Sequence, residues 1–187
     1  MNKDVINLVY FGRITESKNI DIIIKTLSFL IKNGFNANLD LIGGCSDEYK
    51  QKLEYLMATE DIPQEKIFFH GAQSFDFISN KLRFARYFLF PSKEKKEGHS
   101  NSLTEAMAYG VVPIVSKVGF NESICGHPRL VVKEISPECF ACRIMDIEQT
   151  GEWDYFSHYV YNRVIDHFTE EKALETIKKV IKCLNIN

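Results

Sequence analysis

Two glutamates in the segment EGHSNSLTEAMAYG, Glu97 and Glu105, are separated by seven residues. A glycine follows Glu97, and Glu105 lies early in a predicted helix. Carboxylates only accept hydrogen bonds, so the pair could bind hydroxyl groups of one elongated ligand. Each glutamate also has an ordinary structural interpretation. Ser102 and Glu105 fit an S-x-x-E capping box, and Glu97 ends the charged run KEKKE, which is typical of a solvated loop.

Two cations earlier in the chain could bind phosphate. Arg13 follows a predicted strand, and Lys18 stands where the next helix begins. A diphosphate there would meet a forked guanidinium, a point charge and the free N–H groups of a helix start. Solvated surface cations are the alternative interpretation. Gly43 and Gly44 close a later strand, but they belong to neither a G-x-G-x-x-G nor a Walker A motif.

Short apolar segments alternate with amphipathic ones along the chain. This alternation predicts an α/β fold, a single Rossmann-like doubly wound parallel sheet whose strands are covered on both faces. The predicted strands are 6–11, 37–43, 66–71, 86–90, 112–116 and, more weakly, 129–132. The predicted helices are 20–31, 47–58, 75–84, 102–109, 137–147 and 169–183.

In such sheets ligands bind at the carboxyl ends of the strands, beside the helix starts. The segments GRITESK, GGCSD, HGAQ and PSKEKKEGHSNS follow successive strands, so the candidate residues should gather there. Residues 152–187 differ, because they are aromatic-rich, then helical, with no further strand. We expect them to form C-terminal helices that pack along one edge of the sheet.

The composition indicates one globular domain over residues 1–187. A net charge of −2 gives no field for nucleic acid or an anionic membrane surface. Five scattered cysteines favour reduced thiols and a cytoplasmic location. Cys139 and Cys142 form a C-x-x-C, but its helical periodicity and the lack of a second ligand pair favour a helix surface. We expect no metal site and no cofactor.

Six motifs resemble, in their order and spacing, those of glycosyltransferase family 4, the retaining enzymes of GT-B fold. EGHSNSLTEAMAYG resembles the family's E-G-x-x-x-x-x-x-E-A-M-A-x-G signature, and VYFGRITESKNID its strand-G-R entry. LDLIGG, KIFFHGAQ and ARYFLFPSKEKKEG resemble its following strands, and DHFTEEKALETIKKVI its late helix. The resemblance spans nearly the whole chain.

The resemblance implies a role for each matched residue. Arg13 and Lys18 would hold the diphosphate of a nucleoside diphosphate sugar and stabilise its departure. Glu105 would bind the ribose, and Glu97 would orient the transferred sugar. Backbone N–H groups near four residues would meet phosphate or sugar oxygens: Gly98, His99, Ser100 and Asn101. UDP or GDP is the implied nucleotide, and polysaccharide biosynthesis is the implied setting, with a hexosyltransferase-type reaction.

The chain departs from the family pattern at three places. His99 and Ser100 replace the common Phe-Gly, so a more polar lining is expected beside the sugar. Asn19 replaces the usual glycine after Lys18, and Pro113 lies one place later than in the family. No motif selects the base, the donor sugar, the acceptor or the linkage.

Only the second, donor-binding domain of the two GT-B domains is matched. The resemblance therefore implies a donor-binding half that lacks its N-terminal acceptor domain and transfers sugar weakly or not at all by itself. Membrane contact would be possible only through that missing domain. Two other classes of function stay open: a nucleotide-sugar epimerase of GT-B architecture, with His99 or Glu97 as acid or base, and a non-catalytic nucleotide-binding module.

Overall fold

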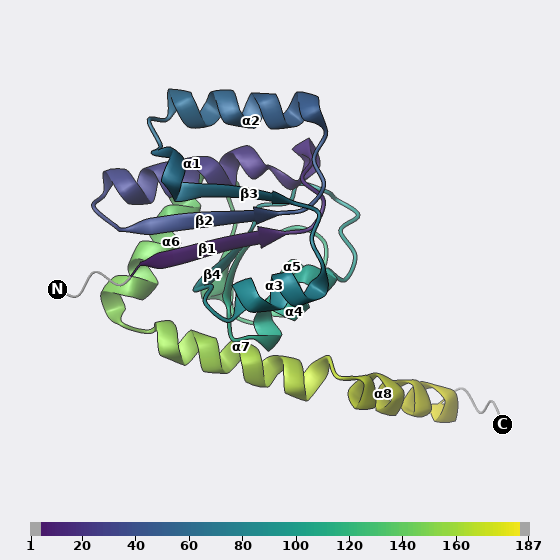
Figure 1. Cartoon of the computed structure of the whole chain (residues 1–187). Helices are drawn as coiled ribbons and strands as arrows, with labels where there is room; N and C mark the ends of the chain where they lie inside the picture. Colours follow the sequence, from purple (N-terminus) through teal and green to yellow (C-terminus); the bar gives the residue numbers. More distant parts are fainter. Residues whose placement is uncertain (1–4, 184–187) are drawn as a thin grey trace.

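Six short apolar segments pair in parallel to form one sheet in the computed structural model, which describes residues 5–183 (Figure 1). The order across the sheet is β3-β2-β1-β4-β5-β6. The strands are β1 (Ile6–Phe11), β2 (Ala37–Ile42), β3 (Ile67–Gly71), β4 (Tyr87–Phe90), β5 (Val112–Ser116) and β6 (Val131–Val132). All six predicted strands and the doubly wound parallel sheet are confirmed. The last strand is short because a 3-10 turn, Pro128–Leu130, takes up its predicted beginning.

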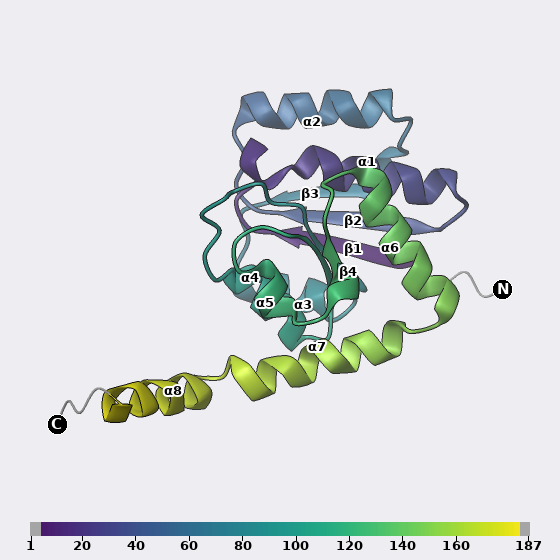
Figure 2. The ribbon, with the colours of Figure 1, turned by 180° about the vertical axis from the view of Figure 1, so that it is seen from behind.

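Helices cover both faces of the sheet. They are α1 (Ile20–Lys32), α2 (Asp47–Thr59), α3 (Phe75–Leu82), α4 (Asn101–Ala108), α5 (Asn121–Cys125), α6 (Pro137–Thr150), α7 (Trp153–His167) and α8 (Glu170–Cys183). Figure 1 shows α1 and α2 on one face and α3, α4 and α7 on the other. Helix α6 packs against α1, as the view from behind in Figure 2 shows. The five-residue α5 was not predicted, because it is too short to show helical periodicity.

The central strands explain why their sequences are continuously apolar. All four residues of β4 are at most 1% exposed, because helices cover both of its faces. The apolar stripe predicted for α1 is likewise buried against the sheet, and Gly34 follows its end with a φ of 83°. By contrast, β3 lies at the edge, and its Phe68 is 41% exposed. Within residues 5–183, no helix is long and apolar enough to span a membrane.

The C-terminal helices lie differently from the prediction. Helix α7 packs on a face of the sheet, against α4 and β5, and not along an edge. The reason is an apolar stripe at every fourth residue, formed by Phe156, Val160 and Val164, which is buried there. Helix α8 continues beyond α7, away from the sheet (Figures 1 and 2). Its Leu174 and Ile177 are about half exposed.

A close approach between two glycines fixes the start of the β1–α1 connection. Gly43 has a φ of 150°, and a Cβ atom on it would lie 1.8 Å from the carbonyl oxygen of Gly12. Gly12 in turn donates its N–H to Ile42 at 3.0 Å. Only glycine at position 43 therefore lets the backbone before Arg13 take this path.

We expect Gly43→Ala to lower the free energy of unfolding by about 1–3 kcal/mol, because the new methyl group would overpack against the Gly12 backbone. Gly44→Ala is the matched control, since nothing lies within 4 Å of a Cβ there. Its effect should stay within about 0.5 kcal/mol. Chemical denaturation of both variants measures the difference, and equal stabilities would contradict the close approach.

Candidate functional site

The β1–α1 and β4–α4 connections meet at the carboxyl ends of β1 and β4. Lys93 donates its backbone N–H to the carbonyl of Ser17 at 3.0 Å, and the Asn19 side chain donates to the carbonyl of Pro91 at 2.8 Å. Asn19 has a φ of 51°, a left-handed conformation that glycine and asparagine adopt most readily. This explains why asparagine serves where the family has glycine. These two hydrogen bonds hold the two connections together in the ligand-free chain.

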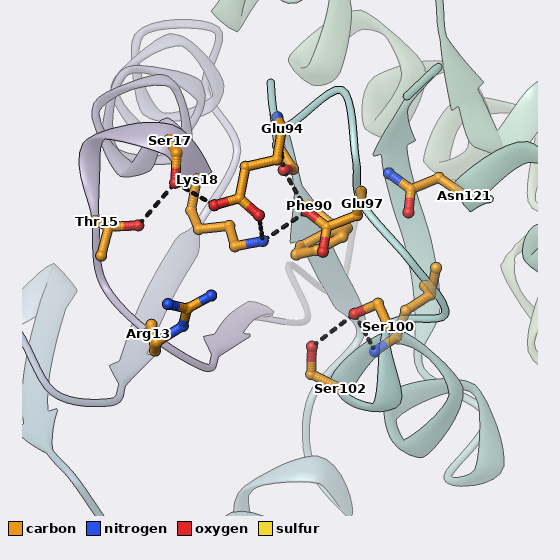
Figure 3. Close-up of polar contacts among 12 residues, drawn as sticks. Arg13, Thr15, Ser17, Lys18, Phe90, Glu94, Glu97, Ser100, Ser102 and Asn121 are labelled. Carbon is orange, nitrogen blue, oxygen red and sulfur yellow. Dashed lines mark hydrogen bonds and ion pairs between the residues drawn. The ribbon is translucent and has the colours of Figure 1, made fainter. Parts of the chain in front are cut away.

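Lys18 lies buried between these connections. Its residue is 6% exposed, and its Nζ atom contacts Glu94 at 2.8 Å and Glu97 at 2.5 Å (Figure 3). The ammonium also lies 5.3 Å from the centre of the Phe90 ring. The alternative of a solvated surface cation is therefore wrong for Lys18. The two carboxylates offset the loss of water that burial imposes on the ammonium.

Glu97 and Glu94 are held by different hydroxyl groups. Ser92, fully buried, donates to Glu97 at 2.6 Å, and Ser17 donates to Glu94 at 2.6 Å. The solvated-loop interpretation of Glu97 is therefore wrong, since its side chain is only 11% exposed. These two glutamates, the two serines and Lys18 together form the Lys18 cluster. Glu94 had no place in the sequence prediction, because the run KEKKE resembles an ordinary charged loop.

The hydrogen bonds to Glu94 change its acidity. Donation by Lys18 and by Ser17, aided by the charges of Lys18 and Arg13, lowers the pKa of Glu94 below its ordinary value of 4.5. The carboxylate is thus held in its ionised form, as a partner for the buried ammonium should be.

Arg13 lies at the edge of the Lys18 cluster with an exposed side chain. Figure 3 shows the side chains of Arg13, Lys18 and Ser102 directed toward one common space. Within residues 5–183, the Arg13 guanidinium makes no hydrogen bond or ion pair, while its carbonyl accepts a hydrogen bond from Tyr10 at 2.7 Å. Burial raises the pKa of Tyr10, so its hydroxyl stays a donor. The backbone of Arg13 is therefore fixed and its charge is free for a ligand.

A hollow of about 660 Å³ lies between the β1–α1 and β2–α2 connections, and Arg13 and Ser17 both line it. None of Lys18, Glu97 and Glu105 lines it. The hollow therefore adjoins the Lys18 cluster at Ser17.

Helix α4 begins earlier than predicted. Its N-cap is Ser100, whose hydroxyl accepts the N–H of Leu103 at 3.4 Å, so Ser102 is the second helical residue. The predicted capping box of Ser102 and Glu105 is therefore wrong. Glu105 is partly buried and, in the described part of the chain, its carboxylate has no hydrogen bond or ion pair. It stands three residues after Ser102, on the same side of the helix.

The start of α4 presents unpaired donors. Across the described residues, no acceptor bonds the backbone N–H groups of Gly98, His99, Ser100 and Asn101. The side chain of His99 is turned elsewhere. Its Nε2 lies 2.7 Å from the hydroxyl of Thr104, and its ring lies 5.2 Å from that of Phe168 at the end of α7.

A further polar group beside the site was missed from the sequence. Asn121 is fully buried, and its side-chain nitrogen donates to the carbonyl of Ser116 at 3.2 Å, but its oxygen has no partner in the described residues. Gly119, in the same connection, lies so close to the carbonyl of Glu97 that a Cβ atom would be 2.1 Å away. The sequence held no signal for these positions, because the segment GFNESI that contains both belongs to none of the motifs named above.

Metal ligands do not gather anywhere in residues 5–183, where no group of three or more His, Cys, Asp or Glu residues could hold an ion. Cys139 and Cys142 are free thiols on α6, the first partly buried and the second exposed, as the helix-surface interpretation predicts.

Solved structures share this fold at low sequence identity. The C-terminal domain of the glycosyl transferase LpcC from Francisella tularensis is 20% identical, with a TM-score of 0.77, and the alignment covers 88% of this chain and 87% of that one. A glycosyltransferase from Rickettsia africae is 19% identical, with a TM-score of 0.82 and coverage of 98% and 49%. HepE from Anabaena, in complex with UDP and glucose, is 15% identical, with a TM-score of 0.81 and coverage of 95% and 48%. The chain thus spans about half the length of the last two.

The parallel sheet, its strand order and these likenesses establish the fold, which is that of the C-terminal domains of GT-B glycosyltransferases. The chain belongs to the family of group 1 glycosyl transferases, whose model matches residues 1–163. Among curated proteins, no sequence matches this chain at a significant level.

Glu94→Gln should destabilise the chain in a pH-dependent way. Because the pKa of Glu94 is lower in the folded state, its ionised form contributes stability above the unfolded pKa, and this contribution is lost as the pH falls through the folded pKa. The variant should therefore be less stable than the wild type at about pH 7, and the difference should be smaller at about pH 3, because the pH falls toward and through the lowered pKa of Glu94.

Denaturation by urea at both pH values measures this difference. Glu54→Gln is the control, since Glu54 is an exposed carboxylate 3.6 Å from Lys50 and such pairs contribute about 0–1 kcal/mol. An equal loss of stability by Glu94→Gln at both pH values would show that the ionic contact is not what stabilises the chain.

Proposed function

We propose that this chain is the donor-binding half of a retaining glycosyltransferase of family 4, which transfers a sugar from a nucleoside diphosphate sugar to an acceptor. The observation that carries the proposal is the position of Lys18. Its buried ammonium lies at the carboxyl ends of β1 and β4, where parallel sheets bind ligands. Arg13 and the unpaired N–H groups at the start of α4 add donors for an anion in the same place.

The free and the engaged groups support separate roles. Arg13 and Lys18 bind the diphosphate, together with N–H groups of residues 98–101. Glu105, whose carboxylate has no partner in the described residues, accepts hydrogen bonds from ribose hydroxyls. Glu97 orients the transferred sugar. HepE is a structural neighbour in complex with UDP, which makes UDP the first candidate nucleotide and GDP the second.

The proposed reaction places negative charge on the departing diphosphate. Arg13 and Lys18 stabilise that charge as fixed cations, in a setting where they need little reorganisation. The helix start contributes less, about 0.3–1 kcal/mol. The cations do the work that a metal ion does in other sugar transferases, and the transferred group is a hexose.

The proposal includes an N-terminal acceptor domain that acts together with residues 1–187. Support comes from the neighbours of about twice this length, in which the chain corresponds to 49% and 48% of the whole. The chain by itself is then expected to bind the donor and to transfer sugar poorly. A cytoplasmic location stays a prediction from the scattered cysteines, and a role in polysaccharide biosynthesis stays a prediction from the family resemblance.

The geometry favours transfer over epimerisation. An epimerase would need an acid or a base at the sugar, but the His99 side chain bonds Thr104 and packs on Phe168. A product assay with the full-length protein separates the three possibilities, since it yields transferred sugar, epimerised donor or no product.

Titration calorimetry of UDP, GDP and ADP into this chain, without metal, tests the donor site. One nucleotide should bind saturably, and Arg13→Ala and Glu105→Ala should each weaken it about tenfold or more. The reason is that hydrogen bonds to charged groups contribute about 1.5–3 kcal/mol.

Glu54→Ala is the matched control and should leave the affinity unchanged, because Glu54 is an exposed residue of α2. The proposal fails if no nucleotide binds either the folded chain or the full-length protein. It also fails if Arg13→Ala and Glu105→Ala both bind the nucleotide as tightly as the wild type does.

A further inference from the structure

The two carboxylates that share Lys18 are held in unequal ways. Glu94 uses both oxygens on the β1–α1 connection: Oε1 accepts from Ser17 at 2.6 Å, and Oε2 accepts from Lys18 at 2.8 Å. Its backbone N–H also lies 3.3 Å from the hydroxyl of Ser92. Glu94 is therefore fixed at three points, two of them to the segment that carries Lys18 (Figure 3).

Glu97 is held through a single oxygen. Its Oε2 accepts from both Lys18 and Ser92, at 2.5 and 2.6 Å, and its Oε1 has no partner in the described residues. If Lys18 moved away, Glu97 would keep the hydrogen bond from Ser92. The contact between Lys18 and Glu97 can therefore break without leaving either glutamate unsatisfied.

The Lys18 ammonium already has anionic partners before a ligand arrives. Arg13 and Lys18 carry two positive charges, Glu94 and Glu97 carry two negative ones, and Glu105 adds a third negative charge to the site. A nucleoside diphosphate adds further negative charge, so it needs a cation that is not already neutralised. An ammonium has three N–H donors, and two of those on Lys18 already point to carboxylates.

We propose that Glu94 is a positioning residue that holds Lys18 in place. In the donor-free protein, Glu97 accepts the hydrogen bond from the Lys18 ammonium that a phosphate oxygen of the donor accepts in the complex. On binding, Lys18 keeps Glu94 and exchanges Glu97 for a phosphate oxygen. The released carboxylate of Glu97 stays on Ser92 and faces the transferred sugar. This inference rests on the proposed function, and it makes the release of Glu97 depend on the diphosphate.

The exchange predicts opposite effects for two chemically identical substitutions. Glu97→Gln removes the competitor of the phosphate, so the affinity for UDP should rise about three- to tenfold. Glu94→Gln removes the anchor of Lys18, so the affinity for UDP should fall about tenfold. A site in which both glutamates only repel the anion would bind UDP more tightly after either substitution.

Calorimetric titration of UDP measures these affinities. If GDP or ADP is the nucleotide that binds, that nucleotide is titrated in its place. The matching nucleoside, followed by NMR chemical shifts, is the ligand without phosphates, and its affinity should stay the same in both variants. A merely structural effect of either substitution would weaken nucleoside and nucleotide alike. Glu54→Gln serves as the control carboxylate.

A double-mutant cycle combines each glutamate substitution with Lys18→Gln and so attributes the effects to the ammonium. In the Lys18→Gln background, Glu97→Gln should no longer raise the affinity for the nucleotide, and Glu94→Gln should no longer lower it. Tighter or unchanged binding by Glu94→Gln, or unchanged or weaker binding by Glu97→Gln, would overturn this inference while leaving the donor site intact. Failure of every nucleotide to bind the wild-type chain and the full-length protein would instead refute the proposed function, and this inference with it.

Discussion

The parallel pairing of β1 with β4 is the constraint on which the site depends. Leu8 pairs with Tyr87 and Val9 with Phe88, so the carboxyl ends of both strands lie side by side. The helices that follow leave toward opposite faces of the sheet, α1 to one and α4 to the other (Figure 1). The two connections therefore face each other at the point where the strand order reverses, which is where such sheets bind ligands. Lys18 meets Glu94 across 76 residues of sequence for this reason alone.

Burial of the Lys18 ammonium organises what surrounds it. A cation removed from water needs close partners, and two carboxylates with their own hydroxyl donors supply a connected network. The neighbouring groups lack such partners within residues 5–183, namely the Arg13 guanidinium, the Glu105 carboxylate and the N–H groups of residues 98–101. The site thus has a satisfied, rigid side and an unsatisfied side. A ligand that carries both anionic and hydroxyl groups matches the second.

The sequence predicted those features that depend on local pattern. Continuous apolar runs located every strand because both faces of the central sheet are covered, and the order of the connections placed Arg13, Lys18 and Glu97 after the right strands. Features that depend on contacts between distant segments were missed. Glu94 resembled one charge in a solvated run, and no residue near it in the sequence predicts its hydrogen bond with Ser17. Ser100 and Ser102 are both candidate first residues of this helix in the sequence, and only the fold decides that Ser100 caps α4. The stripe of α7 is visible in the sequence, but the surface that it covers is not.

Charge explains why local geometry must decide anion binding here. The chain as a whole carries −2, so its field does not attract a nucleotide, and the Lys18 cluster itself has one positive and two negative charges. Two unit charges about 4 Å apart interact by about 4 kcal/mol near a protein surface, against about 1 kcal/mol in water. The partner of one ammonium therefore outweighs any long-range term. Because Glu97 shares its single bonded oxygen between Lys18 and Ser92, its contact with the ammonium is the one that the cluster can lose at least cost. Under the exchange proposed above, the affinity for a diphosphate depends on that one contact.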